Sequence, residues 1–278
     1  MKRLPLLFIG LIIGLGAFAQ ELKLKKRKAD ALTGSQFYKL IVDTSISLSA
    51  REEMIWQEVK NGNIPSFLRK LSSIEINKVI DAKNYQLIIY TTPDCLSIGT
   101  DTDYLYMPTT PMLAQRIANL THTLLPTKSM VDEIYRQAVI KLEPQPIPPT
   151  KAMTTVPVFR THHEIVLKQL KALGSNYKQG SLTAGNKKDI IISNKIYGQA
   201  TPRVVIYGWH KLDGKAIQPV YNKHTNTWAD YSHGVRLISD IGYLNGKKIK
   251  LTDLLKDPIL HELLSDEGII MEAKYPID

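Results

Sequence analysis

Residues Arg203–Leu237 read RVVIYGWHKLDGKAIQPVYNKHTNTWADYSHGVRL, and this stretch organises the rest of the chain. It holds three of the seven histidines and two of the three tryptophans. The apolar run Val204–Tyr207 is rich in β-branched and aromatic residues, which is typical of a strand. Gly234, near the end, tolerates backbone conformations that other residues avoid. Polar groups crowded between two strand-like runs predict a functional site on a rigid scaffold.

The first residues are typical of a secretory signal peptide. Lys2 and Arg3 precede an apolar run from Leu4 to Phe18, and small residues precede Gln20. An uncleaved membrane anchor is the alternative, but this run is short for a span of about 20 residues. We therefore expect a signal peptide over residues 1–19 and a secreted or periplasmic protein, without a transmembrane span after cleavage.

The positive charge is concentrated at the N-terminus. The chain has 36 basic and 26 acidic residues, a formal net charge of +10. Residues 1–28 contain seven of the basic residues and one of the acids, so the remainder has 29 against 25, or +4. We predict that residues 20–36 form a solvated basic tail and linker, and we expect no nucleic-acid partner. Contact of this tail with anionic envelope polymers or lipid headgroups stays open.

We predict a single α+β domain over residues 37–278, in which amphipathic helices flank a mixed sheet and loops between the C-terminal strands carry the site. The chain is long enough to bury a core. Cys95 is the only cysteine, which excludes an internal disulfide and favours a buried thiol. The proline-rich residues 143–149 are interpreted as a stiff strut inside this domain. We expect a monomer.

Periodicity and capping signals place the elements along the chain. Helices are predicted to begin near Ser49, Pro65, Met112, Pro126, Glu164, Leu251 and Pro258. Strands are predicted at 38–42, at 73–90 in two parts broken near Asp81–Asn84, and at 182–183, 190–193, 204–207 and 235–239.

Four residues of the central stretch are candidates for catalysis: His210, Asp230, Ser232 and His233. Ser232 and His233 are adjacent, so in an extended strand their side chains point to opposite faces. Ser232 as a nucleophile therefore needs another histidine, such as His210, as its base, with Asp230 orienting that ring. Alternatively His233 is the general base and Arg236 holds an anionic group. Structural roles, such as Asp230 capping the turn before Gly234, are equally compatible with the sequence.

A metal site would need His210, His224, Asp230 and His233 to come together. Their spacing matches no compact zinc motif, so we expect no metal and no other cofactor. Lys187 and Lys188 lie in a glycine-containing turn and are candidates for binding a phosphate or carboxylate. The phosphate-loop pattern is missing there, and a surface hairpin is the default interpretation.

The segment Ser232–Leu237, SHGVRL, lies downstream of His210 and resembles the SHGCIRL signature of L,D-transpeptidases. Those exported cell-wall enzymes have a nucleophilic cysteine after the His-Gly pair. Val235 occupies that position here, so the thioester route is closed to this chain. The longer pattern YGWH, IQP and DYSHG, with Leu125–Tyr135 and Lys187–Asp189, resembles a group of exported bacterial proteins of unassigned activity.

These observations lead us to expect an exported hydrolase- or transferase-like protein that acts on a cell-envelope or extracellular polymer, either peptidoglycan or carbohydrate. The predicted substrate-binding residues are Lys187, Lys188, Trp209, Trp228, Tyr231 and Arg236. The alternative is a non-catalytic module that binds a sugar or glycopeptide on an aromatic platform. That platform would consist of Tyr207, Trp209, Trp228 and Tyr231.

Overall fold

The computed structural model describes residues 20–277 and is an α+β protein, as predicted. Its strands form a six-stranded sheet, a four-stranded sheet and two smaller pairs. Buried apolar side chains from Leu22 to Tyr275 make the main core, and a second, smaller cluster includes Cys95, Tyr106 and Val166. The predicted signal peptide lies outside the described residues. Within the described residues, no helix combines the length and apolar character needed to cross a membrane.

The segment after position 20 is held against the protein by its backbone, while the side chains of Lys23, Lys25, Lys26 and Lys28 are exposed to solvent. The Leu22 amide donates to the Arg69 carbonyl at 2.8 Å, and the Leu71 amide donates to the Gln20 carbonyl at 2.9 Å. Arg27 donates to the side chain of Asn63 at 2.8 Å. Backbone pairing and the buried Leu22 therefore fix the start of the predicted basic tail to the body of the protein.

Helix α1 (Gly34–Ile41) replaces the strand predicted at 38–42. The Thr33 side chain accepts from the Gln36 amide, and the Gln36 side chain accepts from the Thr33 amide. This reciprocal pair is a capping box. Phe37 and Ile41 are four residues apart and share its buried face. Four further helices begin within two residues of their predicted starts: α2 (Leu48–Lys60), α3 (Pro111–Thr121), α4 (Lys128–Gln137) and α6 (Leu251–Lys256). Helix α5 (Val156–Ala172) begins eight residues before the predicted start at Glu164. The helices predicted from Pro65 and Pro258 are short 3-10 turns, at Ser66–Leu68 and Leu260–Leu263.

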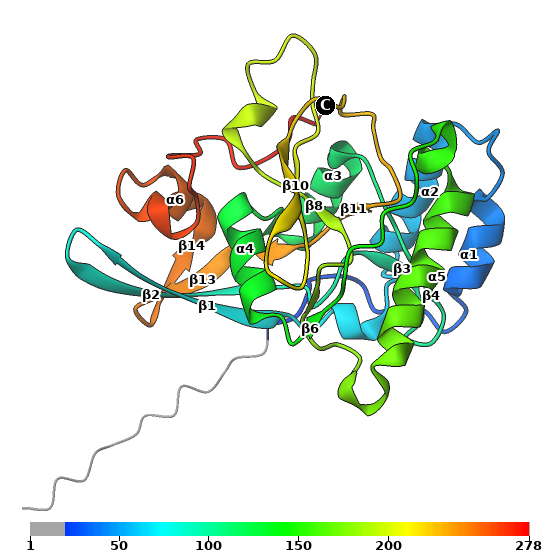
Figure 1. Cartoon of the computed structure of the whole chain (residues 1–278), viewed down its shortest axis with the longest axis horizontal. Helices are drawn as coiled ribbons and strands as arrows, with labels where there is room; N and C mark the ends of the chain where they lie inside the picture. The colour runs from blue at the N-terminus through cyan, green and yellow to red at the C-terminus, as the bar shows by residue number, and fades with distance from the viewer. Residues whose placement is uncertain (1–19, 278) are drawn as a thin grey trace, which may run out of the picture.

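The six-stranded sheet has the order β14-β13-β2-β12-β5, with β1 paired to β2. Its strands are β1 (Ser72–Ile80), β2 (Lys83–Thr91), β5 (Thr123–Leu124), β12 (Ile238–Ser239), β13 (Ile241–Leu244) and β14 (Lys247–Lys250). The predicted break is confirmed, because Asp81 and Ala82 form the turn with φ of 47° and 59°. The β1–β2 hairpin projects beyond the body, while α1, α2 and α5 gather at the opposite side (Figure 1).

The four-stranded sheet positions the site. It consists of β8 (Lys188–Ile190), β9 (Ile206–His210), β10 (Ala216–Tyr221) and β11 (His233–Gly234), in the order β10-β9-β8-β11. Strands β8 and β11 are parallel, and the other neighbours are antiparallel. Lys188 lies opposite Gly208 on one side and His233 on the other. The remaining short strands are β3 (Ser97–Gly99), β4 (Tyr104–Tyr106), β6 (Ile140–Lys141) and β7 (Thr183–Ala184).

The proline-rich residues 143–149, interpreted as a strut, contain neither helix nor strand. Ile147 fastens this strut to the site-bearing stretch. Its amide donates to the Tyr231 hydroxyl at 2.7 Å, and its carbonyl accepts from the same hydroxyl at 3.1 Å. The strut therefore runs across the surface beside β11.

Candidate functional site

Seven side chains around β8, β9 and β11 form what we call the polar core site. They are His162, Lys187, Lys188, Trp209, Trp228, Asp230 and His233. The backbone is strained where β9 enters it. Trp209 has φ of 56°, a left-handed conformation that is rare for a bulky residue, and follows Gly208 at 104°. Such strain persists where the surrounding structure enforces it, often at functional sites.

Asp230 is a buried carboxylate surrounded by donors. Its Oδ1 atom accepts from the Ser232 amide at 2.8 Å and from the Ser232 hydroxyl. Its Oδ2 atom accepts from Nε1 of Trp228 at 3.1 Å. Burial alone would raise the pKa of Asp230, but His233, Lys188 and the Ser232 bonds lower it well below its ordinary value. Asp230 is therefore ionised at neutral pH.

His233 is the partner of Asp230, with Nε2 3.8 Å from Oδ2 of the carboxylate. Burial lowers the pKa of His233 to about 4, so the ring is neutral at pH 7. Both ring nitrogens are buried, and neither has a hydrogen-bond partner among the described residues. A neutral imidazole with no fixed partner, beside a charged carboxylate, is chemically able to accept a proton.

Ser232 does not fit the predicted nucleophile. Its hydroxyl donates to Asp230, and its exposed fraction is 0%. The predicted arrangement, with His210 as its base and Asp230 orienting that ring, is wrong because His210 faces another carboxylate. Ser232 instead has a structural role, because its amide and hydroxyl donate to Asp230 and stabilise the charged carboxylate.

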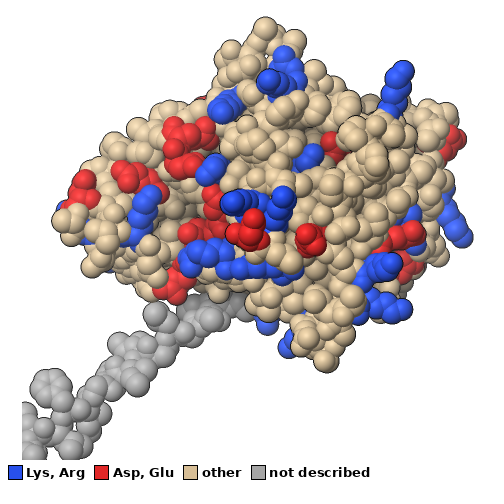
Figure 2. All heavy atoms as spheres, in the orientation of Figure 1, with Lys and Arg blue, Asp and Glu red and all other residues tan. Residues whose placement is uncertain are grey.

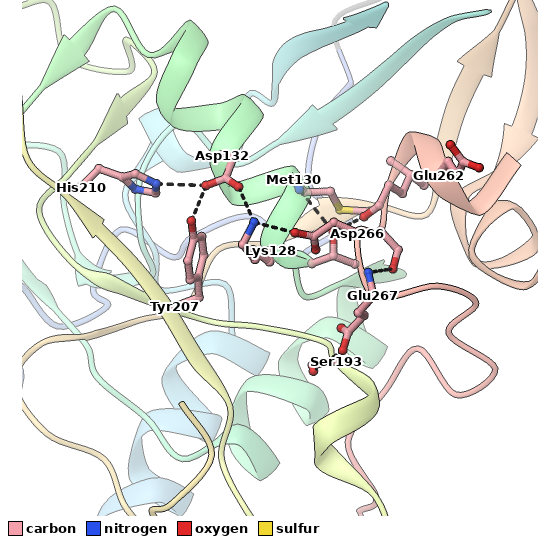
Figure 3. A network of polar contacts seen from close by, with 12 residues as sticks. Lys128, Met130, Asp132, Ser193, Tyr207, His210, Glu262, Asp266 and Glu267 are labelled. Carbon is pink, nitrogen blue, oxygen red and sulfur yellow. Dashed lines mark hydrogen bonds and ion pairs between the residues drawn. The ribbon is translucent and has the colours of Figure 1, made fainter. Parts of the chain in front are cut away.

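His210 belongs to a separate network between β9 and α4 (Figure 3). Its Nε2 atom lies 3.1 Å from Oδ1 of Asp132, which also accepts from the Tyr207 hydroxyl at 2.7 Å. The Lys128 ammonium links Asp132 at 3.0 Å to Asp266 at 2.6 Å. The His210 ring stacks on Tyr135, with centroids 4.5 Å apart. The structure thus places His210 apart from the other three predicted catalytic residues, which are neighbours.

Lys187 and His162 are paired in the interior. The Nζ atom of Lys187 lies 3.0 Å from Nδ1 of His162 and donates to the Tyr231 carbonyl at 2.5 Å. Burial lowers the pKa of Lys187 to about 8 and that of His162 to about 2. Both side chains are buried, so the predicted surface hairpin is wrong for Lys187.

Lys188 is the more accessible lysine. Its Nζ atom lies 5.2 Å from the centre of the Trp209 ring, a cation–π contact. Burial lowers its pKa, and Asp230 opposes that change. Lys188 is half-buried, and its charge lowers the pKa of both Asp230 and His233.

Arg236 is a structural residue and not the predicted substrate contact. It is 1% exposed and donates to the carbonyls of Thr92 and Thr183, at 3.0 and 2.9 Å. Its Nε atom lies 3.5 Å from Asp189. These bonds join three distant segments inside the core. Cys95 lies close by, buried, as predicted.

The predicted aromatic platform is not an exposed surface. Tyr207, Trp209 and Tyr231 are 7%, 3% and 3% exposed, so they cannot form an open face together. A different aromatic row reaches the surface. The Tyr221 and His224 rings are 5.1 Å apart, and His224 stacks on Trp228 at 4.6 Å with planes 9° apart. All three are half-buried, and Trp228 connects this surface row to Asp230.

One residue of the polar core site, His162, was not predicted, and neither were Asp132 and Asp94, which belong to other hydrogen-bond networks. His162 was placed just before a helix that begins at Glu164, but α5 begins at Val156 and turns both His162 and His163 inward. Asp94 accepts from the Tyr106 hydroxyl at 2.5 Å and from Asn186 at 2.9 Å. The spacing of buried positions along α5 was the one signal available for His162.

Among residues 20–277, no group of three or more histidine, cysteine or acidic side chains is arranged to hold a metal ion. Basic and acidic side chains are intermingled across the face in Figure 2, and most of that face is uncharged. Comparison with protein-family models, with curated proteins and with solved structures found no match.

Proposed function

We propose that the chain is an exported hydrolase- or transferase-like enzyme that acts on a cell-envelope or extracellular polymer at the polar core site. The observation that carries the proposal is the Asp230–His233 pair. The two groups lie 3.8 Å apart, and their surroundings keep the carboxyl charged and the imidazole neutral. Two neighbouring titratable groups in opposite environments are the usual basis for acid–base catalysis.

In this proposal His233 takes a proton from water or from a substrate hydroxyl, and Asp230 stabilises the imidazolium that results. Their separation is longer than a hydrogen bond. Such contacts are often long in ligand-free enzymes and shorten when substrate binds. Lys188 holds an anionic oxygen of the substrate, because it is the half-buried cation beside the pair.

The polymer is proposed to lie along the row Tyr221, His224 and Trp228. Stacked, half-buried aromatic rings offer an apolar face with polar edges, which suits a sugar ring or a peptide. Trp228 also covers Asp230 through its indole bond. Substrate therefore reaches the pair when Trp228 moves aside, which is a loop movement on the scale common in enzymes.

The test is digestion of isolated peptidoglycan and of a set of extracellular polysaccharides by the purified protein, with released fragments identified by mass spectrometry. His233→Ala should lower the rate about 100-fold or more, the range for loss of a general base. His122→Asn is the matched control, since His122 is exposed and its left-handed backbone, φ 55°, suits asparagine.

Release of fragments at the same rate by His233→Ala and the parent would contradict the proposal. Retention of a polymer without any released fragment would favour the non-catalytic binding module instead. The surface row supports that second candidate, because it needs only Tyr221, His224 and Trp228.

A further inference from the structure

We propose that the open edge of β1, together with a groove beside it, binds an extended acidic peptide as an added strand. None of the residues that line this groove belongs to the polar core site, so the inference is independent of the proposed function. Three observations carry it: the unpaired backbone of Ser73, the contact between Gln137 and Glu75, and the charge of the groove.

One edge of β1 is open. Within the described sheet, β1 pairs with β2 alone. Backbone groups point alternately to the two sides of a strand, so every second residue of β1 faces away from β2. Glu75 is one of these, because both of its backbone groups bond to the Gln137 side chain. Ser73, two residues earlier, faces the same way. Its amide and carbonyl have no partner on that side among residues 20–277.

The same edge already has an added segment just before β1. The Leu71 amide donates to the Gln20 carbonyl at 2.9 Å, and Glu21 forms an antiparallel bridge with Lys70. Leu71 is two residues before Ser73, so its amide points to the same edge. An extended segment therefore already lies along this edge in the antiparallel direction, and Ser73 is the next open position.

Gln137 covers the position after Ser73. Its Oε1 atom accepts from the Glu75 amide at 3.0 Å, and its Nε2 atom donates to the Glu75 carbonyl at 2.9 Å. A side-chain amide that bonds both backbone groups of one residue imitates a neighbouring strand. Covering an edge in this way protects it from unwanted pairing. Ser73 is thus the open position between two covered ones.

A groove of about 660 Å³ lies at Ser73 and Gln137. Ligand sites have volumes of about 300–1,000 Å³. Two apolar side chains that line the groove are accessible: Val139 is 73% exposed, and Phe67 is half-buried. Alternate side chains of an added strand point to the same face, so every second residue of the peptide can contact this apolar surface. Addition of a strand to a sheet edge is a common mode of peptide recognition.

The charge of the groove favours an acidic peptide. Its charged lining residues are Lys70 and Lys178, both exposed. Neither lysine forms an ion pair in the described part of the chain. The neighbouring carboxylate of Asp101 already accepts from the Ser66 amide and hydroxyl. Two ammonium groups without counter-ions attract an acidic peptide and repel a basic one.

The test measures binding of a fluorescein-labelled hexapeptide of alternating glutamate and valine to the purified full chain, by fluorescence anisotropy. We expect saturable binding, and binding of a lysine–valine hexapeptide at least about tenfold weaker. Two further glutamate–valine peptides carry N-methyl groups on one or the other alternate set of amides. The set that faces β1 should weaken binding about tenfold or more, and the other set should not. Equal binding of all the acidic peptides would mean charge attraction only and would overturn the proposal.

Ser73→Pro removes the amide that faces the groove, and an edge strand tolerates proline where its N–H points outward. It should weaken binding about tenfold. Val79→Pro is the matched control, since Val79 faces outward by the same alternation, about 20 Å further along β1. Unchanged binding by Ser73→Pro would contradict the proposal. The methylated peptides test the unaltered protein, so the inference stays open to refutation if Ser73→Pro does not fold.

Gln137→Ala should change the affinity in the opposite direction. It frees both backbone groups of Glu75 for the peptide, so binding should tighten by roughly fivefold, the contribution of about one hydrogen bond. Weaker binding by this variant would place the peptide elsewhere.

Two other occupants of the edge would give different results. A second copy of the chain would produce a dimer in sedimentation velocity that Ser73→Pro dissociates. The chain's own residues 1–19 would block the groove, so that the peptide binds only to a chain beginning at Gln20. Either result would overturn the acidic peptide as the partner.

Discussion

The Nε2 atom of His210 lies 3.1 Å from Oδ1 of Asp132, a residue 78 positions earlier in the chain. This contact joins the end of β9 to α4, and Tyr207 and Lys128 share the same carboxylate. Asp132 is partly exposed, at 39% of its side chain, so solvent weakens the pair. The network therefore holds the end of β9 in place. His210 lies two residues after Gly208, which is paired with Lys188 on β8.

Asp132→Asn should lower the free energy of unfolding by about 1 kcal/mol, because it weakens hydrogen bonds to one carboxylate without creating a cavity. Polymer cleavage should stay within about twofold of the parent, a change of under about 0.5 kcal/mol in the barrier. Urea unfolding and the digestion assay measure the two effects. Asp213→Asn, in an exposed turn, serves as the control. A loss of activity as large as that of His233→Ala would return His210 to the catalytic group and add Asp132 to it.

Arg236→Met should destabilise the protein by about 3–5 kcal/mol, since it leaves Asp189 buried without its cation and two carbonyls without their donor. We expect poor expression and a strongly lowered thermal midpoint. Arg203→Met is the comparison, because Arg203 makes one exposed bond to a carbonyl. A stable Arg236→Met protein with weakened ligand binding would support the substrate-binding role predicted from the sequence.

Acidification should destabilise the fold below about pH 6.5, the ordinary pKa of histidine. Burial lowers the pKa of His233 to about 4 and of His163 to about 3. The unfolded chain therefore binds more protons as the pH falls from 6.5 towards 4, and stability decreases over that window. Each group contributes roughly 1.4 kcal/mol per pH unit there. Urea unfolding at a series of pH values measures the slope.

His163→Gln should make that slope shallower by one proton, since glutamine does not titrate. His163 suits this test because its contacts are with Tyr104 and Tyr106, away from the proposed chemistry. An unchanged slope in this variant would show that other groups cause the acid sensitivity.

Trp228→Ala should weaken polymer binding about tenfold, which corresponds to roughly 1.4 kcal/mol for one lost stacking surface. It should also lower turnover, because Asp230 loses the indole donor at Oδ2. Co-sedimentation with the polymer measures binding. Trp56→Ala is the matched control, since Trp56 on α2 is also half-buried but lies against the Arg116 guanidinium of α3. Equal effects of the two variants would indicate loss of stability and not of the aromatic row.

The sequence predicted elements whose signals are local. Alternation with a break near Asp81–Asn84 located the β1–β2 hairpin, and the apolar periodicity from Met112 located α3. The region of α1 was predicted as a strand because Ile41 and Val42 favour strands. The Thr33–Gln36 capping box and the spacing of Phe37 and Ile41 decide for a helix.

The part of the site that was predicted also depends on local sequence signals. Asp230, Ser232 and His233 are close in sequence, so their proximity followed from the turn before Gly234. The pairings of His210 with Asp132 and of Lys187 with His162 depend on how β9, α4 and α5 pack. A single sequence holds no local signal for such tertiary contacts. The burial of Trp209 likewise depends on how β9 packs, since all five residues of this strand are buried.

The Tyr231 hydroxyl, bound to both backbone groups of Ile147, acts as a latch at the middle of the proline-rich strut. A protease cut a few residues to either side of Ile147 would leave that latch closed. A nicked molecule should then migrate as one intact particle on gel filtration and separate into two pieces only in denaturant. Tyr231→Phe removes the latch while keeping the ring, so the strut of this variant should be cut faster than that of the parent.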